Sequence, residues 1–96
     1  MFVVLISFPA IKAGKDAEFR QWFAKSNETF SHYEGFIRRR LVKPIKEGNH
    51  VAIVEFENQE AFDAMHGSPD HDIAGEHARP LFDWTPTPRF YEVLIG

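Results

Sequence analysis

The sequence predicts a single α+β domain with the ferredoxin-like split βαβ order, β-α-β-β-α-β. The chain has 96 residues, which is enough for one hydrophobic core and too few for two. Its apolar residues change from the two-residue period of strands to the period of helices and back, and Gly and Pro separate the segments. This order places both helices on one face of a four-stranded antiparallel sheet. We therefore expect residues 1–96 to form one domain.

The first strand and the first helix differ clearly in hydrophobic period. Residues 2–8 are β-branched and aromatic, and Pro9 and Gly14 mark the turn that follows. From Asp16, aromatic residues fall on one face of a helix that we expect to end between residues 31 and 33. This stripe consists of Phe19, Trp22, Phe23 and Phe30.

The next two segments predict an antiparallel hairpin. Residues 36–42 form a strand that stops before Pro44 and Gly48. Residues 50–57 are the most β-like run after the first strand, and they pair naturally with it. Residues 43–49 are then the connecting turn.

The second helical region is predicted to be broken. Asn58 is a good N-cap for a helix over residues 59–66, and Ser68 followed by Pro69 begins a helix again. The break therefore falls near Gly67.

Prolines set the limits of the last strand. Pro80, Pro86 and Pro88 confine residues 81–87 to a loop, and residues 89–95 then form a strand. Several strands are apolar on both sides, so the face without helices would be a large exposed patch on a monomer. We therefore expect a homodimer packed sheet to sheet.

Composition narrows the classes of partner and site. The net charge of −3 provides no positive field for nucleic acid or an anionic membrane, so we expect neither as a partner. The absence of Cys excludes disulfides and thiolate metal sites, and it fits a reducing compartment. The short apolar run near the N-terminus does not have the pattern of a secretory signal. We expect a cytoplasmic protein.

Four segments of the chain resemble the antibiotic-biosynthesis-monooxygenase-like family. They are the strand start Gly35-Phe36, the passage Val54–Phe62, the break Met65–His71 and the last strand Phe90–Val93. The resemblance spans nearly the whole chain and implies a dimeric α+β barrel with a pocket between sheet and helices in each subunit. Similar members include cofactor-independent oxygenases of quinol-like aromatics and haem-degrading enzymes, so the resemblance does not fix the reaction.

The haem-degrading branch fits the sequence poorly. Its Asn, Trp and haem-ligating His correspond here to Ser7, Met65 and Gly75, and none of the three matches. His77 lies two residues beyond the ligand position and could replace it only with a different local register. We therefore rank haem degradation below cofactor-independent oxygenase chemistry.

Three histidines around the break are the first candidate site residues. His71 and His77 are candidate catalytic bases, and His66 is a candidate substrate-binding residue. The alternative for His71 is a capping or scaffold role at the third helical position, and the alternative for His77 is an exposed structural role. Because the spacings are five and six, the three histidines would not converge on a metal ion without the break in the helix, and we expect no metal site.

Aromatic residues and one arginine complete the candidate substrate site. Phe56, Phe82 and Trp84 could form stacking walls for a planar ligand, although packing alone explains them equally well. Trp22 is a further candidate substrate-binding residue, although an aromatic residue in a helical stripe belongs to the core more often than to a pocket. Arg39 points to the face opposite Arg38 and Arg40, and we expect one or two of the three to pair with Glu55, Glu57 or Glu92. A functional arginine among the three could hold a carboxylate or a developing phenolate.

Three functions remain open from the sequence. The first is a cofactor-independent monooxygenase acting on a small aromatic or quinol-like substrate, and the chain has no flavin or nicotinamide fingerprint that would indicate a cofactor. The second is a non-catalytic dimer that binds a small hydrophobic molecule or haem in the same pocket. The third is a structural module whose pocket is filled by its own side chains.

Overall fold

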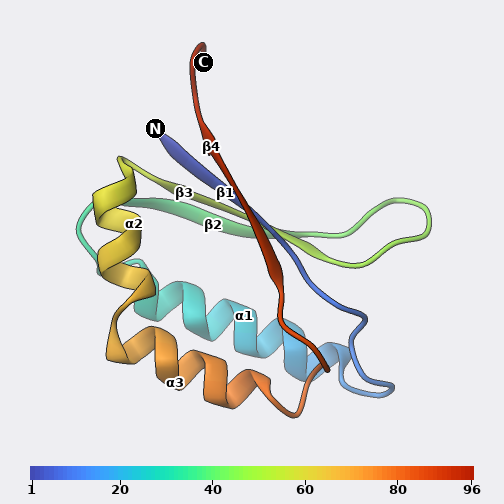
Figure 1. The fold of residues 1–96 in the computed structure, drawn as a ribbon. Coiled ribbons are helices and arrows are strands. Elements are labelled where there is room, and N and C mark those ends of the chain that lie inside the picture. The colour runs from blue at the N-terminus through green and yellow to red at the C-terminus, as the bar shows by residue number, and fades with distance from the viewer.

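A computed structural model describes all of residues 1–96. The fold is built on one antiparallel sheet. Its strand order is β2-β3-β1-β4, and every neighbouring pair is antiparallel. The strands are β1 (Phe2–Ser7), β2 (Phe36–Val42), β3 (Val51–Phe56) and β4 (Thr87–Glu92). Figure 1 shows the hairpin of β2 and β3 extending away from the helices.

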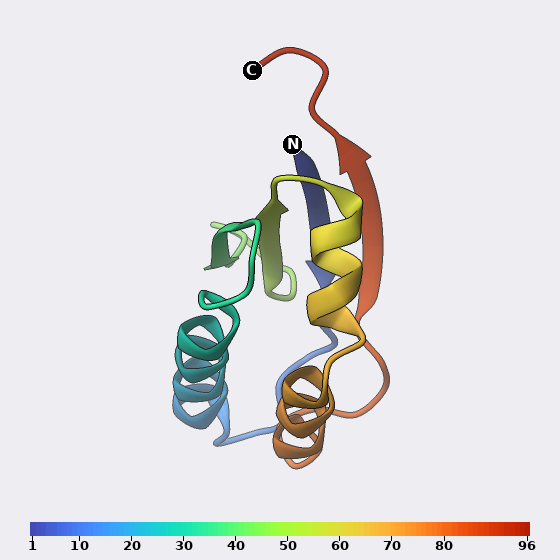
Figure 2. The ribbon, with the colours of Figure 1, turned by 90° about the vertical axis from the view of Figure 1, so that its left-hand side faces the viewer.

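Three helices lie on one face of this sheet. They are α1 (Asp16–Phe30), α2 (Gln59–His66) and α3 (Pro69–Ala78). Figures 1 and 2 show α1 and α3 side by side below the sheet, with α2 between α3 and the strands. The ferredoxin-like split βαβ arrangement with helices on one face is therefore confirmed. None of these helices is long and apolar enough to cross a lipid bilayer.

The break between α2 and α3 occurs where the sequence predicts it. The side chain of Asn58 accepts a hydrogen bond from the backbone N–H of Ala61 at 2.9 Å, which caps α2. Ser68 caps α3 by accepting the N–H of His71 at 3.3 Å, and Pro69 occupies the first turn, where it leaves no donor unpaired.

The last strand starts and ends earlier than predicted. β4 runs over Thr87–Glu92, whereas the sequence suggested residues 89–95. Pro88 fits inside the strand because β4 is an edge strand paired only with β1, so one row of its backbone groups needs no partner in the sheet.

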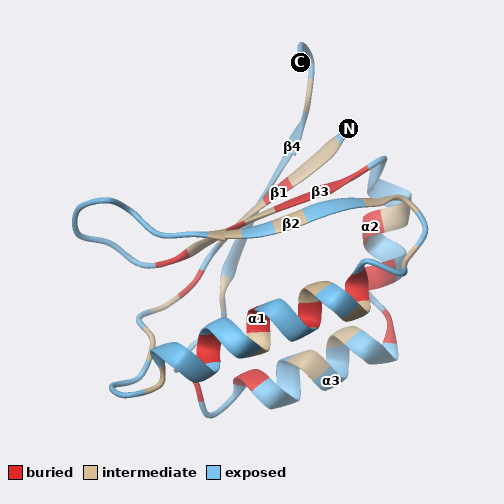
Figure 3. Ribbon diagram, turned by 180° about the vertical axis from the view of Figure 1, so that it is seen from behind, coloured by how far each residue is buried: buried red, intermediate tan, exposed pale blue.

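The core lies between the sheet and α1 and is largely aromatic. Its largest fully buried side chains are Phe19, Phe30, Phe56, Val4 and Val54. Figure 3 shows the buried residues on β3 and on the side of α1 that faces the sheet. The aromatic stripe predicted for the first helix therefore supplies the helical half of the core, as its spacing indicates.

The opposite face of the sheet carries a predicted ion pair. Arg38 donates a hydrogen bond to the buried carboxylate of Glu55, and an Nη atom of Arg40 lies 3.9 Å from the same carboxylate. The hydrogen bond from Arg38 holds the pKa of Glu55 below its usual range. Arg39 points the other way, to the helix face, where it lies in one row with Val54, Val4 and Phe90.

Two glycines with similar backbone conformations provide a test of how tightly the turn before β2 packs against α2. Gly14 (φ 77°) has open space where a Cβ would lie, but a Cβ on Gly35 (φ 80°) would lie 2.6 Å from the Cβ of Ala61. We expect Gly14→Ala to lose about 1–2 kcal/mol for the left-handed backbone, and Gly35→Ala to lose about 1–3 kcal/mol more for overpacking. Urea denaturation measures both; equal losses would contradict the close packing.

Candidate active site

A cavity of about 520 Å³ lies between the inner face of the sheet and α3. α3 makes its main contacts with α1 and α2, so side chains of the sheet and α3 face each other across this space. Its wall is mostly apolar, which is typical of sites for small organic ligands. Its aromatic lining includes Trp22, Phe30, Phe62, Phe82, Trp84 and Phe90.

The break between α2 and α3 brings two histidines into contact. His66 ends α2 and His71 lies in the first turn of α3, and their ring centroids are 4.4 Å apart. His66 also stacks on Phe62, and His71 stacks on Phe30. On a continuous helix a spacing of five would separate the two rings, so the pair depends on the break. The structure contains no group of three or more His, Asp or Glu side chains that could hold a metal ion.

His71 is a neutral proton acceptor at neutral pH. Burial lowers the pKa of its imidazole below the ordinary 6.5, and the positive charges of His66 and Arg39 lower it further, against a smaller opposite effect of Asp72. A neutral imidazole in the wall of a cavity can accept a proton from a bound hydroxyl group.

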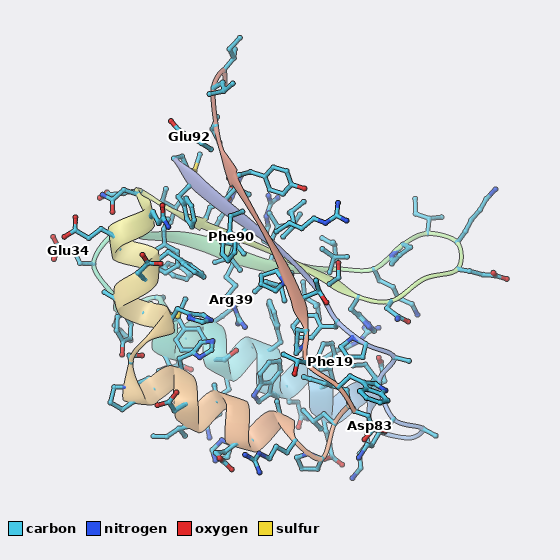
Figure 4. All side chains as sticks on the ribbon, in the orientation of Figure 1. Phe19, Glu34, Arg39, Asp83, Phe90 and Glu92 are labelled. Carbon is cyan, nitrogen blue, oxygen red and sulfur yellow. The ribbon has the colours of Figure 1, made fainter.

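Arg39 extends from β2 to the side of the cavity where the sheet faces α1, and it lines the cavity there (Figure 4). Its Nη1 donates hydrogen bonds to Ser26 Oγ at 2.7 Å and to Asn27 Oδ1 at 2.8 Å. Its guanidinium carbon lies 4.0 Å from the ring centroid of Phe23 and 5.1 Å from that of Phe30. Burial lowers the pKa of Arg39 to about 9, so the group is still a cation at neutral pH.

The structure brings six of the eight candidate site residues together around the cavity. These six are Trp22, Arg39, His66, His71, Phe82 and Trp84. Trp22 satisfies its indole N–H by donating to the carbonyl oxygen of Ala74 at 2.9 Å, which ties α1 to α3.

Phe56 and His77 lie elsewhere. Phe56 is completely buried and packs edge-on against Phe36 and Phe62, so it belongs to the core. His77 is exposed on the face of α3 that it shares with Ile73, which is 52% exposed. The cavity instead uses the face of α3 that carries His71, Ala74, Gly75 and Ala78.

The wall residue Phe90 and two residues that hold Arg39 were not among the candidates from the sequence. Phe90 reaches the cavity because the β1–β4 register places it opposite Val4 on the inner face, and alternation along β4 could have indicated it. Ser26 and Asn27, which hold Arg39, gave a weaker signal: an arginine on the inner face of a sheet needs acceptors on the helix that covers it.

The family model described as antibiotic biosynthesis monooxygenase matches residues 1–76. The chain belongs to the antibiotic biosynthesis monooxygenase family. A comparison with curated proteins gives no match.

Solved structures show the same fold. SnoaB of Streptomyces nogalater, a cofactor-independent oxygenase, is 22% identical, with a TM-score of 0.77 over 99% of this chain and 92% of its own. A Nitrosomonas europaea protein that bears the family name is 11% identical, with a TM-score of 0.83 over 99% of this chain and 100% of its own. Rv0793 of Mycobacterium tuberculosis is 15% identical, with a TM-score of 0.78 over 99% and 95%. Proteins that differ widely from this chain in sequence therefore share its arrangement of sheet and helices.

The electrostatic setting of His71 can be measured directly. We expect its imidazole to titrate below pH 6.5 in NMR spectra, and His66→Gln to raise the pKa of His71 because a neighbouring positive charge is removed. The pKa should stay below 6.5 in the variant, because burial is the largest cause. Titration of His71 above pH 6.5 in the wild type would contradict its burial.

The same shift affects stability. The unfolded chain binds a proton at His71 at a higher pH than the folded chain does, so the free energy of unfolding should fall as the pH is lowered from 6.5 toward the lowered pKa. In His71→Gln this part of the pH dependence should be lost.

Proposed function

We propose that this protein is a cofactor-independent monooxygenase that oxidises a small aromatic, quinol-like substrate in the cavity. The observation that carries the proposal is the neutral imidazole of His71 in the wall of an aromatic-lined cavity. Membership of the family supports it, and the fold shared with SnoaB, a cofactor-independent oxygenase, agrees with it.

In the proposed reaction His71 acts as the base. It accepts the hydroxyl proton of a phenol or quinol, which leaves an electron-rich anion. This anion reduces O₂, a C–O bond forms at a ring carbon that carried hydrogen, and His71 returns its proton to the resulting peroxide. Loss of water then leaves a carbonyl group. The substrate loses one C–H bond and one O–H bond, whose four electrons and two protons reduce O₂. One oxygen atom becomes the new carbonyl oxygen and the other becomes water, so no external reductant is consumed.

The aromatic wall has two tasks in this reaction. Trp22 and Phe90 are not fully buried and provide flat apolar surfaces in the cavity wall on which a planar substrate can stack. They also limit access of water to the anion and to the peroxide, which protects both from premature protonation.

Oxygen uptake tests the proposal. With a panel of naphthols, anthrones and hydroquinones, we expect the wild type to consume one O₂ per substrate oxidised and His71→Gln to lose about a hundredfold or more in rate. His77→Gln is the matched control, because His77 lies outside the cavity, and it should keep the wild-type rate.

Two outcomes would overturn this assignment. Equal loss in both variants would remove the role of His71 as the base. Ligand binding without oxygen uptake across the panel would favour the alternative, a protein that binds a hydrophobic small molecule without turnover, and a haem titration would show whether that molecule is haem.

We also propose that the protein acts as a homodimer through the outer face of its sheet. Val3, Leu5 and Ile53 lie on this face, opposite to the helices, and Tyr91 beside them is 45% exposed. The charge of Glu55 on this face is neutralised within the chain. A second copy would cover the apolar patch with an identical patch, as a closed two-fold interface requires.

Sedimentation of two matched variants tests the dimer. Leu5→Glu places a charge in the centre of the outer face and should convert the wild-type dimer to a monomer. Ile73→Glu places the same charge on the exposed face of α3 and should leave the dimer intact. A wild type that sediments as a monomer at all concentrations would refute the interface.

A further inference from the structure

We propose that Arg39 is the receptor for an oxyanion, so that the substrate of this cavity carries an ionised oxygen group, a carboxylate or a phenolate, in addition to its aromatic ring. This inference rests on the proposed function only in taking the cavity as the substrate site. It adds a specificity that neither the family nor the apolar wall requires.

The first argument is the missing counter-ion. None of the ion pairs in the structure includes Arg39. The other charged residues of the cavity are paired: Arg79 lies 3.3 Å from Glu76, and Asp83 lies 3.3 Å from Lys12. An arginine that is largely removed from solvent is normally paired with an acid, so the unpaired positive charge of Arg39 remains for a ligand.

The second argument is that the guanidinium is fixed in position. Nη1 is held by Ser26 and Asn27, and the Nδ2 of Asn27 donates a further bond to the backbone carbonyl of Arg39 at 2.7 Å. The rings of Phe23 and Phe30 lie close to its carbon. A group held in this way loses little conformational freedom when it binds a ligand.

The third argument concerns the donors that remain. Arg39 has five N–H groups, and its hydrogen bonds to the protein use only those of Nη1. The donors on Nε and Nη2 have no acceptor, yet they are not sealed from solvent, because the only buried side-chain atom without a partner is His50 Nε2. Since Arg39 lines the cavity, the free Nε–Nη2 edge is available to a ligand there.

The chemistry of this edge selects the ligand group. Two parallel N–H donors match the two oxygens of a carboxylate, and one of them can hold a phenolate oxygen. The surrounding apolar wall weakens screening by water and salt, and it favours an aromatic ring on the same molecule.

Calorimetry without oxygen tests the inference separately from turnover. The probes are 2-naphthoate and 2-naphthamide, which have similar shapes and differ in charge. We expect the wild type at pH 7 to bind the carboxylate about tenfold more tightly or better. Arg39→Gln should remove this preference, and His71→Gln, which leaves the guanidinium in place, should keep it.

A second arm distinguishes the source of the oxyanion. If the site stabilises a phenolate formed in place, bound 2-naphthol should show the absorbance of its anion at pH 7, and Arg39→Gln should abolish this signal. If the protein prefers the carboxylate but does not ionise naphthol, the substrate already carries an acid group. If it ionises naphthol but has no carboxylate preference, the oxyanion is a phenolate that forms in the site.

Equal affinity of the wild type for both naphthalene probes, together with no ionisation of naphthol, would overturn the inference. A preference that persists in Arg39→Gln would overturn it as well. Arg39→Lys covers the case in which the Gln variant does not fold, because it keeps the charge but not the paired donors, and we expect it to weaken the preference. None of these measurements depends on oxygen uptake. Their outcome therefore tests the role of Arg39 independently of the monooxygenase proposal.

Discussion

The packing of α1 against the sheet is the constraint on which the site depends. Phe19, Phe23 and Phe30 anchor one side of the helical layer to the strands, whereas α3 is held mainly by α1 and α2. The space between α3 and the sheet is therefore not filled by the core, and the cavity occupies it. The indole N–H of Trp22, bound to the backbone of α3, keeps the two helices in register around this space.

The fold could be predicted almost completely from local signals, because period, caps and prolines each act within a few residues. The limits of β4 could not, since the tolerance of Pro88 depends on the strand lying at the edge of the sheet. For the site, sequence patterns indicated His71 and Arg39. They also suggested Phe56 and His77, which lie outside the cavity. Tertiary packing decides which side of a ring or of a short helix faces the cavity, and local sequence patterns do not show it.

Burial has the same physical effect on both polar groups of the site, with opposite consequences for their charge. It lowers the pKa of His71 below 6.5 and that of Arg39 to about 9, so at neutral pH one is neutral and the other is charged. The charge of Arg39 itself helps to keep His71 neutral. An anion bound at Arg39 would weaken this effect and make His71 a stronger base once the substrate is in place.

The two tryptophans of the chain, Trp22 and Trp84, both line the cavity. The indole of Trp22 is part-buried and hydrogen-bonded, whereas that of Trp84 is 88% exposed at the rim, on a residue with a φ of 67°. The buried aromatic core between α1 and the sheet consists of phenylalanines, which emit weakly. All of the tryptophan fluorescence of the protein therefore comes from the walls of the cavity, and a ligand that enters the cavity changes the surroundings of both tryptophans without any attached dye.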